Sequence, residues 1–508
     1  MAGFAGQNMS PSTRLLAGLV MALSNFMVVL DTSIANVSVP HIAGSLAISP
    51  DQGIWVITSY SVAEAVCVPL TGWLTQRFGT VRVYLFAMAG FCAFSILCGL
   101  SPTLGFLVAA RVGQGLCGGP IMPITQTLLL RVFPAEQRGT AMGLWAMTTV
   151  VAPIAGPLLG GTISDNWSWH WIFFINIPIA ITAVFGAYTL LRQVETPTAR
   201  ARIDVVGLVL LVVWVGALQI MLDIGRDHDW FGSAEIVALA IIAGVGFLFF
   251  VVWELTEKQP VVDLRVFRHR GFTFGVLALG LIYATMFSSV VVTPQWLQGF
   301  MGYTAADAGY VVAWQGVFAV VMSPIVGRLS GRFDPRLLVS IGVLWLAFSA
   351  SLRTNWTADS DYWTLAIPHL LNGFGLPLFF VPITIATLSS VEPQETASAA
   401  GLSSFMRTLS GAVGTSVATT VWLDREQIDR ADLTNVLNVP AGMQDQLAQH
   451  GISAAQAPGV LANLVDQQAV AVAITQLFQL AAVLFMFSAA IVWLIPKPRR
   501  VASTEGAH

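Results

Sequence analysis

Charged residues are scarce in this chain. They make up 10% of its 508 residues, against about 25% in ordinary globular proteins, and only Lys258 and Lys497 are lysines among the 24 basic residues. A soluble protein of this size needs charged side chains to cover its surface, whereas 56% of this chain is hydrophobic. The composition therefore excludes a soluble multidomain protein and a disordered chain, and it indicates a protein that is solvated by lipid.

The chain also lacks paired cysteines, a basic surplus and a phosphate-binding lysine loop. Its 4 cysteines lie in apolar runs without C-x-x-C spacing, which excludes a disulfide framework and a thiolate metal site. A net charge of −3 offers no basic surface to nucleic acid. The G-x-G-x-x-G run at 113–118 lies inside an apolar span, where a dinucleotide site would not form. We expect no cofactor, no metal, no nucleic-acid partner and no enzymatic activity.

Long apolar runs dominate what is present. A helix needs about 20 apolar residues to cross a membrane. Fourteen runs of this kind are found, near 14–37, 54–74, 83–101, 104–130, 140–163, 171–191, 204–222, 234–255, 272–297, 308–329, 337–353, 363–390, 397–423 and 472–495. They do not alternate every second residue as barrel strands do, and the first lacks the cleavage site of a signal peptide. The expected fold is an all-α polytopic membrane protein with 14 transmembrane helices.

The basic residues predict the orientation of these spans. Arginine and lysine gather in cytoplasmic loops, and most of the basic residues here fall in every second loop if the N-terminus is cytoplasmic. One such loop, around Glu392 and Glu395, has none. We therefore expect both termini in the cytoplasm and, in a bacterium, the inner membrane as the location.

The chain repeats itself, as duplicated transporters do. Gly72, Leu74, Arg77 and Phe78 recur 255 residues later as Gly327, Leu329, Arg332 and Phe333. Looser matches point the same way: 123–125 recurs at 382–384, and Gly156 recurs as Gly414. The predicted organisation is a tail (1–13), a six-helix bundle (14–191), a linker with two extra helices (192–271), a second six-helix bundle (272–495) with a loop at 424–471, and a tail (496–508).

Four ionisable side chains lie within apolar spans. Each such residue costs roughly 2.5–3.5 kcal/mol at mid-membrane, so these residues usually line a polar path. They are Asp31, Glu64, Arg111 and Arg407. The alternative is a structural buried pair or a residue that reaches the headgroups, which stays open for all four and is favoured for Glu64. Candidates for the wall of a substrate cavity are Asn25, Tyr60, Phe287, Trp314 and Phe318. His369 is expected to be a packed helix residue more than a proton relay.

Four motifs, in order along the chain, carry a resemblance to a known family. Residues 30–40 resemble a first-helix signature, and residues 72–82 resemble G-x-L-x-D-R-x-G-x-x-R. Farther along, residues 111–115 resemble R-x-x-Q-G and residues 156–161 resemble G-P-x-x-G-G. Together they resemble the fourteen-helix drug:proton antiporter branch of the major facilitator superfamily, and residues 165–176 and 424–471 resemble its multidrug exporters. Gln76 stands where the superfamily usually has Asp, which puts a charge relay at that loop in doubt.

The resemblance implies roles for individual residues. A carboxylate facing an arginine can change between the protonated and ionised forms as its surroundings change, so we expect Asp31 and Arg111 to be the proton-coupling pair, with Glu64 as a further candidate. Residues with motif or gating roles would be Gly72, Arg77, Gly79, Gln114, Gly115, Pro153, Gly156, Pro157, Gly160, Gly161, Gly327, Arg332 and Arg407. Simple close packing is an equally good explanation for the glycines.

The function expected on this basis is proton-driven export of hydrophobic or cationic toxic compounds by alternating access. The alternatives are an uptake symporter of the same fold, since fold alone does not fix function, and a non-transporting receptor or channel. The stretch 424–471 is far longer than ordinary helix connections, and Met443–His450 within it is helix-prone. The resemblance implies that a periplasmic membrane-fusion adaptor and an outer-membrane channel are partners; the alternative is a solvated loop.

Overall fold

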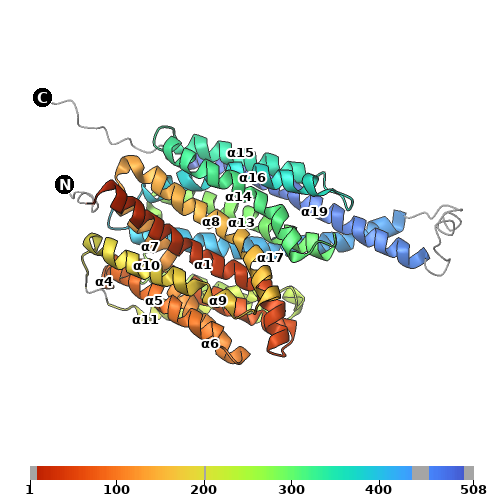
Figure 1. Cartoon of the computed structure of the whole chain (residues 1–508), viewed down its shortest axis with the longest axis horizontal. Helices are drawn as coiled ribbons and strands as arrows, with labels where there is room; N and C mark the ends of the chain where they lie inside the picture. The colour runs from red at the N-terminus through yellow and green to blue at the C-terminus, as the bar shows by residue number, and fades with distance from the viewer. Residues whose placement is uncertain (1–8, 200–201, 437–456, 497–508) are drawn as a thin grey trace.

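The computed structural model describes the chain except for residues 1–8, 200–201, 437–456 and 497–508. Its regular elements in the described ranges are helices, which run roughly parallel in one bundle (Figure 1). The first half contains α1 (Pro11–Ser45), α2 (Pro50–Gly53), α3 (Trp55–Cys67), α4 (Thr71–Phe78), α5 (Thr80–Gly99), α6 (Leu104–Gly118), α7 (Ile121–Val132), α8 (Arg138–Asn166), α9 (Trp171–Phe174) and α10 (Asn176–Leu190).

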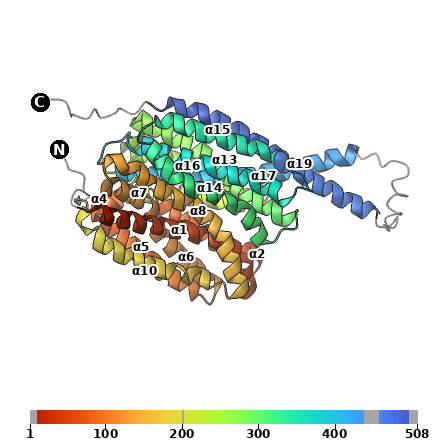
Figure 2. The ribbon, with the colours of Figure 1, turned by 45° about the horizontal axis from the view of Figure 1, so that its top comes forward.

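Two further helices, α11 (Val205–Ile224) and α12 (Ala234–Thr256), join this half to the second. The second half contains α13 (Arg270–Gly299), α14 (Ala305–Leu329), α15 (Pro335–Arg353), α16 (Tyr362–Leu388), α17 (Thr396–Val436) and α19 (Ala457–Ile491). We call the end of the bundle at which α1 begins the terminal end, and the opposite end the distal end. The two six-helix halves lie side by side (Figure 2). The linking helix α11 packs against α3 of the first half and α17 of the second.

The all-α membrane fold predicted from the sequence is confirmed, and the helix count is confirmed in part. All fourteen expected runs are helical, and 12 helices of the described residues are long and apolar enough to span a membrane. The two remaining runs differ for physical reasons. The chain bends at Pro69 between α3 and α4, because proline cannot donate the helical hydrogen bond. The helix α17 contacts other helices and carries many serines and threonines. It is therefore less apolar than the 12 helices counted as spans.

Local chemistry accounts for where several helices begin and break. Ser10, Thr103 and Asp204 each accept a hydrogen bond from a backbone N–H in the first turn of α1, α6 and α11, as residues at the N-cap do. The Gly119-Pro120 pair interrupts the span between α6 and α7. In contrast, α8 stays continuous through Pro153 and Pro157.

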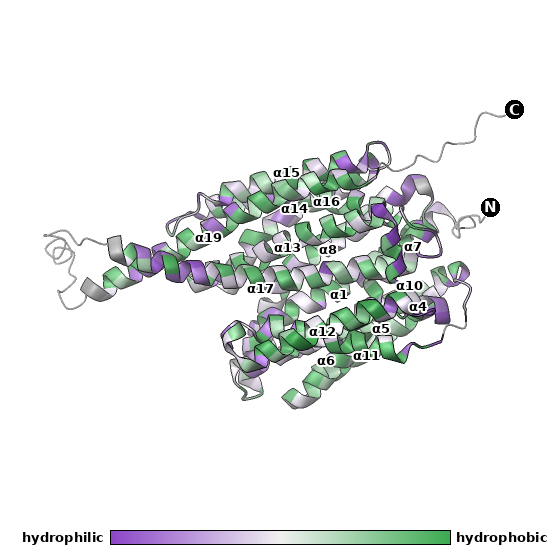
Figure 3. Cartoon of the chain, turned by 180° about the vertical axis from the view of Figure 1, so that it is seen from behind, coloured by the Kyte–Doolittle hydropathy of each residue, from purple (hydrophilic) through white to green (hydrophobic). Residues whose placement is uncertain are grey.

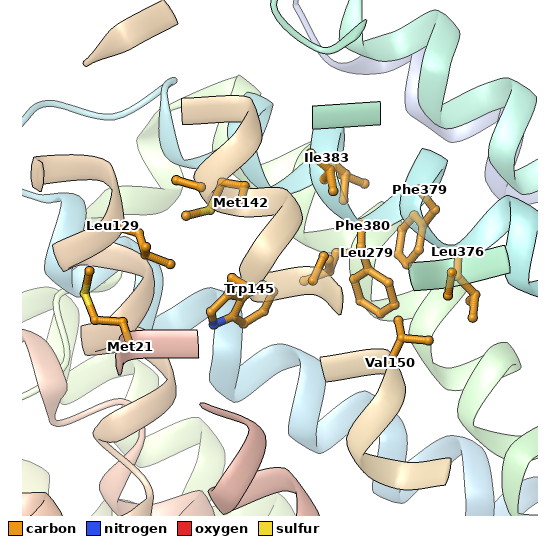
Figure 4. Close-up of a cluster of buried hydrophobic side chains, with 14 of the residues drawn as sticks. Met21, Leu129, Met142, Trp145, Val150, Leu279, Leu376, Phe379, Phe380 and Ile383 are labelled. Carbon is orange, nitrogen blue, oxygen red and sulfur yellow. The ribbon is translucent and has the colours of Figure 1, made fainter. Parts of the chain in front are cut away.

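The distribution of polarity matches a protein surrounded by lipid. Hydrophobic residues cover the sides of the bundle, and hydrophilic residues gather near its ends (Figure 3). Large apolar side chains such as Phe86, Phe185 and Phe249 are exposed on the outside, which would be unfavourable in water but is expected in a bilayer. Inside, a cluster that includes Met21, Trp145, Leu279 and Phe380 continues from one half to the other (Figure 4).

The stretch 424–471 differs from the expected loop. The structure continues α17 to Val436 and begins α19 at Ala457, so both helices project beyond the bundle at the distal end (Figure 1). Arg430 and Asp466 form an ion pair of 2.7 Å between them, and Gln476 donates to Asp429 at 3.2 Å. The projecting part is therefore a pair of helices in mutual contact; the segment Met443–His450 lies outside the described residues.

Candidate functional site

The buried charges of α1 and α6 meet in one ion pair. Arg111 Nη1 donates to Asp31 Oδ2 at 2.6 Å, and the two side chains are 1% and 0% exposed. The guanidinium lies over the ring of Tyr60, 4.1 Å from its centre, a cation–π arrangement. Both residues stood out in the sequence as charges within apolar spans, the family resemblance implied that they form a pair, and the structure brings the two residues together.

Amide and hydroxyl groups from two more helices complete the network. Gln114 Nε2 and Asn176 Nδ2 both donate to Asp31 Oδ1, at 2.9 and 2.6 Å. Asn176 also donates to the Ser95 hydroxyl at 3.0 Å. Every oxygen of the Asp31 carboxylate is thus hydrogen-bonded, which is the condition under which a buried charge is tolerated.

Arg111 keeps two acceptors besides Asp31. Its Nε donates to the carbonyl oxygen of Val56 at 3.0 Å, and its Nη1 to Gln114 Oε1 at 2.8 Å. The arginine would therefore retain hydrogen-bond partners if Asp31 were neutralised. If Arg111 were removed instead, Asp31 would lose the only ion-pair partner that it has in the part of the chain that the structure describes.

Two members of the network, Ser95 and Asn176, were not singled out as site residues from the sequence. Asn176 opens α10 and Ser95 lies in α5, so neither stands out as an ionisable group in an apolar run. Asn176 is a buried amide near the start of an otherwise apolar span. That signal is visible in the sequence, but it is too common to select this residue.

Glu64 and Arg407 are two further buried charges. Among the described residues Glu64 makes no hydrogen bond to Asp31 or Arg111, but it interacts electrostatically with Arg407 and also with Arg111 and Asp31. The Arg407 guanidinium lies 5.0 Å from the ring centre of Trp145 in α8 and contacts the Met122 sulfur in α7. Arg407 is 3% exposed, and it therefore places a charge from the second half among aromatic and apolar groups of the first.

A small cavity lies between the two halves, close to this arginine. It is lined by Thr149, Val150, Pro153, Tyr283, Met286, Phe287, Val290, Gln315, Leu376 and Phe380, which come from α8 on one side and from α13, α14 and α16 on the other. Most of these side chains are apolar or aromatic, but the space is far smaller than the roughly 300–1,000 Å³ of a pocket for a small organic ligand, so the helices would have to move apart to admit one. Val150, Leu376 and Phe380 are seen together in Figure 4.

Only one of the five predicted cavity residues, Phe287, lines this space. Asn25 instead donates to the hydroxyls of Thr148 and Thr149, at 2.9 Å each, and joins α1 to α8. Tyr60 is covered by Arg111, and Trp314 donates to the Tyr362 hydroxyl at 3.0 Å. The remaining candidate, Phe318, is not part of the cavity wall in the described residues. These four residues therefore lie outside this space, and their role at a substrate cavity stays a prediction; helices that are apolar all round do not reveal which face lines a cavity.

Glycines let helices of the two halves touch at the terminal end. A Cβ on Gly143 of α8 would lie 2.8 Å from the carbonyl oxygen of Ser323 in α14, and a Cβ on Gly139 would collide with the backbone of Gly327. On the other side of the bundle, Gly72 of α4 packs against Ser398 of α17 in the same way. The terminal end is therefore closed in this conformation.

The glycines of the 156–161 motif pack within the first half. A Cβ on Gly160 would lie 2.9 Å from the carbonyl oxygen of Ile34, and Gly156 meets Ser33, both in α1. The Ser33 hydroxyl donates to the carbonyl oxygen of Pro153 at 3.0 Å. Gly161 differs, because a Cβ there would meet nothing within 4 Å. The motif thus lets α8 lie directly against the helix that carries Asp31. Pro157 faces the other way, with its Cβ at 3.9 Å from the Cβ position of Gly309 in α14.

The loop between α4 and α5 contains a carboxylate that the motif itself lacks. Gly79 has a φ of 93°, a conformation that favours glycine. Beside it, Glu195 accepts hydrogen bonds from the backbone N–H groups of Val81 and Arg82, at 2.9 and 3.0 Å. An acid from the segment after α10 therefore occupies the N-terminus of α5, where a helix favours negative charge.

The remaining motif residues lie at contacts or turns between helices. Arg77 lies 5.7 Å from the ring centre of Trp73 and 5.6 Å from that of Phe78. A Cβ on Gly115 would lie 2.5 Å from the carbonyl oxygen of Tyr60, so α6 packs closely on α3. Arg332 lies in the turn between α14 and α15. Each of these residues lies where two helices meet.

Comparison with known proteins agrees with these features. Residues 21–415 match the Major Facilitator Superfamily. The chain is 43% identical to the multidrug export protein EmrB of Escherichia coli K12, over 94% of this chain and 95% of the relative. It is 44% identical to the fatty acid resistance protein FarB of Neisseria gonorrhoeae, over 94% and 96%. Among solved structures, the proton:xylose symporter XylE superposes with a TM-score of 0.60 at 13% identity, over 96% of each chain. The chain belongs to the major facilitator superfamily and is a multi-pass membrane protein.

Proposed function

We propose that this protein exports hydrophobic or cationic toxic compounds in exchange for protons, by alternating access. The observation that carries the proposal is the fully buried Asp31–Arg111 pair, 2.6 Å apart. Its relatives include proteins named for multidrug export and for fatty acid resistance, so both substrate classes are candidates. The proposed location is a bacterial inner membrane, with both termini in the cytoplasm.

Proton binding would act on Asp31. Breaking a buried ion pair by neutralising one partner is costly, about 3–5 kcal/mol, unless the other partner retains acceptors. Arg111 has such acceptors in Val56 and Gln114, and the amides of Gln114 and Asn176 keep their contact with Asp31. Arg111 and the two amides would therefore keep hydrogen-bond partners whether or not Asp31 carries a proton, which is what a site that binds and releases a proton requires.

A change at Asp31 would reach the interface between the halves through α8. Ser33, two residues from Asp31, is bonded to α8 at Pro153, and the opposite side of α8 packs along α14. Rearrangement of α1 would therefore shift the helix that closes the terminal end and borders the cavity. Alternating access of this kind, by movement of one half against the other, is how duplicated transporters work.

The proposed partners are a membrane-fusion adaptor and an outer-membrane channel. Their support is the pair of projecting helices formed by the ends of α17 and α19 at the distal end (Figure 2). Under the proposed orientation these helices enter the periplasm, where an adaptor would meet them.

A transport assay tests the direction and the coupling. We expect cells that express the protein to accumulate less tetraphenylphosphonium than cells with an empty vector, and a protonophore should abolish the difference. In proteoliposomes, an imposed pH gradient should drive the cation toward the acidic side. Greater accumulation in the energised cells would instead indicate an uptake symporter, and transport that is indifferent to the pH gradient would contradict proton coupling.

A further inference from the structure

The second half repeats part of the helix packing that surrounds the Asp31 site. The positions of Arg111, Gln114 and Gly115 correspond, 258 residues later, to His369, Asn372 and Gly373, of which the glycine is identical. The packing repeats as well: Gly115 lets α6 approach the carbonyl oxygen of Tyr60 in α3, and Gly373 lets α16 approach that of Gln315 in α14. Tyr60 and Gln315 are 255 residues apart, which is the spacing of the repeated loops. His369 thus occupies the position in the second half that Arg111 occupies in the first.

The buried charges differ between the two halves. In the first half the network contains Asp31, and Ser95 of α5 belongs to it. In the second half the buried charges are those of Arg353, the last residue of α15, and His369 of α16. Arg353 and His369 interact electrostatically and are 3% and 2% exposed. The second half therefore buries two basic groups where the first half buries an acid and a base.

These basic groups have unused donors. The Nε and Nη2 atoms of Arg353 and both ring nitrogens of His369 have no hydrogen-bond partner among the described residues, and no carboxylate of the described chain is in ion-pair contact with Arg353. A buried charged group without an acceptor is unfavourable by several kcal/mol. Such a group in a folded protein requires an explanation, and a missing ligand is one.

The surroundings of the pair are aromatic. The Arg353 guanidinium lies 5.3 Å from the ring centre of Phe478 and 6.0 Å from that of Trp356, and Trp356 lies 6.0 Å from His369 and stacks on Trp296 at 5.5 Å. Cation–π contacts are worth about 0.5–2 kcal/mol, so they offset only part of the desolvation. The site combines two donors for an anion with apolar walls.

The depth of the site fits an amphiphilic ligand. Arg353 is the last residue of α15, and His369 lies seven residues after the start of α16 at Tyr362, or about 10 Å at 1.5 Å per residue. The pair therefore lies within about 10 Å of the distal end of the span. The carboxylate of a membrane-dissolved compound resides at this boundary, with its tail in the hydrocarbon.

We propose that Arg353 and His369 form a carboxylate-binding site in the second half, for organic acids and in particular for single-chain amphiphiles. The planar fork of arginine donates to both oxygens of a carboxylate, and the imidazole supplies a further donor. The proposal rests on the proposed export function and deepens it, because it assigns one of the candidate substrate classes to a site in the half opposite to Asp31.

Equilibrium binding of laurate to the full-length protein in phosphatidylcholine nanodiscs tests the site. Dodecanol and dodecyltrimethylammonium carry the same tail with a neutral or cationic head, and acetate carries the head alone. We expect saturable laurate binding that Arg353→Gln weakens about tenfold or more, and His369→Gln by less. Arg425→Gln, at an exposed position near the distal end, is the matched control and should leave laurate affinity unchanged.

Competition identifies the source of the carboxylate. Displacement of laurate by acetate would assign the site to free organic acids as well, and failure of acetate would assign it to membrane amphiphiles; either supports a carboxylate site. Dodecanol binding as tight as laurate binding, displacement by chloride at equal concentration, or unchanged laurate affinity in Arg353→Gln would overturn it.

A second variant covers the case in which the glutamine protein does not fold. Arg353→Lys keeps the charge and loses the fork, so laurate affinity should still fall severalfold; wild-type affinity would contradict the proposal. Asp31→Asn separates the two hypotheses, because it should stop proton-driven transport while laurate binding persists. Absence of proton-driven transport by the wild type with intact laurate binding would refute only the export function.

Discussion

Gly139 of α8 and Gly327 of α14 lie so close that neither position has room for a Cβ between the two backbones. Gly327 belongs to the repeated loop motif of the second half, and Gly139 lies in the first turn of α8. Contact between these glycines holds the two halves together at the terminal end, and this end is the one that must open for a substrate to enter from the cytoplasm in the proposed cycle.

Gly139→Ala should therefore favour conformations in which the terminal end is open. We expect faster maleimide labelling of a cysteine introduced at Ser398, which is buried against Gly72 in the closed state. Gly161→Ala, on the same helix but facing open space, is the control and should leave the labelling rate unchanged. Equal rates in both variants would show that the contact does not control opening.

Asp31→Asn should abolish proton-driven export while the protein still inserts and folds. Asparagine has a similar shape and still accepts a hydrogen bond, but its amide does not bind or release a proton near neutral pH. The measurement is pH-gradient-driven efflux in proteoliposomes at matched protein amounts. Full efflux by the asparagine variant would exclude Asp31 as the coupling acid.

Arg111→Lys should reduce transport by at least about tenfold. Arginine bonds Asp31, Val56 and Gln114 at once, and an ammonium group on a flexible stem cannot reproduce that geometry. The readout is the initial rate of tetraphenylphosphonium efflux, with Arg425→Lys as a control for arginine replacement at an exposed position. A normal rate in the lysine variant would mean that charge alone is required.

Glu195→Gln should weaken the junction of α4 and α5. The carboxylate accepts two N–H groups at the start of α5, and interactions of an anion with a helix N-terminus are worth roughly 0.3–1 kcal/mol, or up to about 2 when partly buried. We expect a lower melting temperature by a few degrees and a reduced transport rate. Glu136→Gln, in the next loop at the same end, provides the comparison; equal effects of the two changes would remove any special role of Glu195.

Replacing residues 430–466 with a short Gly/Ser linker should spare insertion and transport in proteoliposomes but weaken adaptor cross-linking and whole-cell resistance. The reason is that the deleted part of α17 and α19 projects beyond the bundle and contributes no group to the Asp31 network or to the cavity. A control that replaces only the ion pair, Arg430→Ala with Asp466→Ala, tests whether their contact matters. Undiminished cross-linking of the shortened protein to its adaptor would refute the docking role.

The sequence by itself determined the environment, the helical class and the identity of the coupling candidates. Scarce charge and fourteen apolar runs require lipid and internally satisfied backbones, and an acid or an arginine in such a run stands out because it is costly there. Asp31 and Arg111 could therefore be named, and the repeats predicted two related halves.

Only the tertiary structure decided which groups share a site. Asn176 and Ser95 join the hydrogen-bond network of Asp31 because α5 and α10 pack beside α1. Glu64 interacts electrostatically both with this network and with Arg407 of the second half. The cavity wall and the glycine contacts between α8 and α14 depend on the rotation of each helix about its axis. A helix that is apolar on every face carries no periodic signal for that rotation, so it is fixed by packing between residues far apart in the chain.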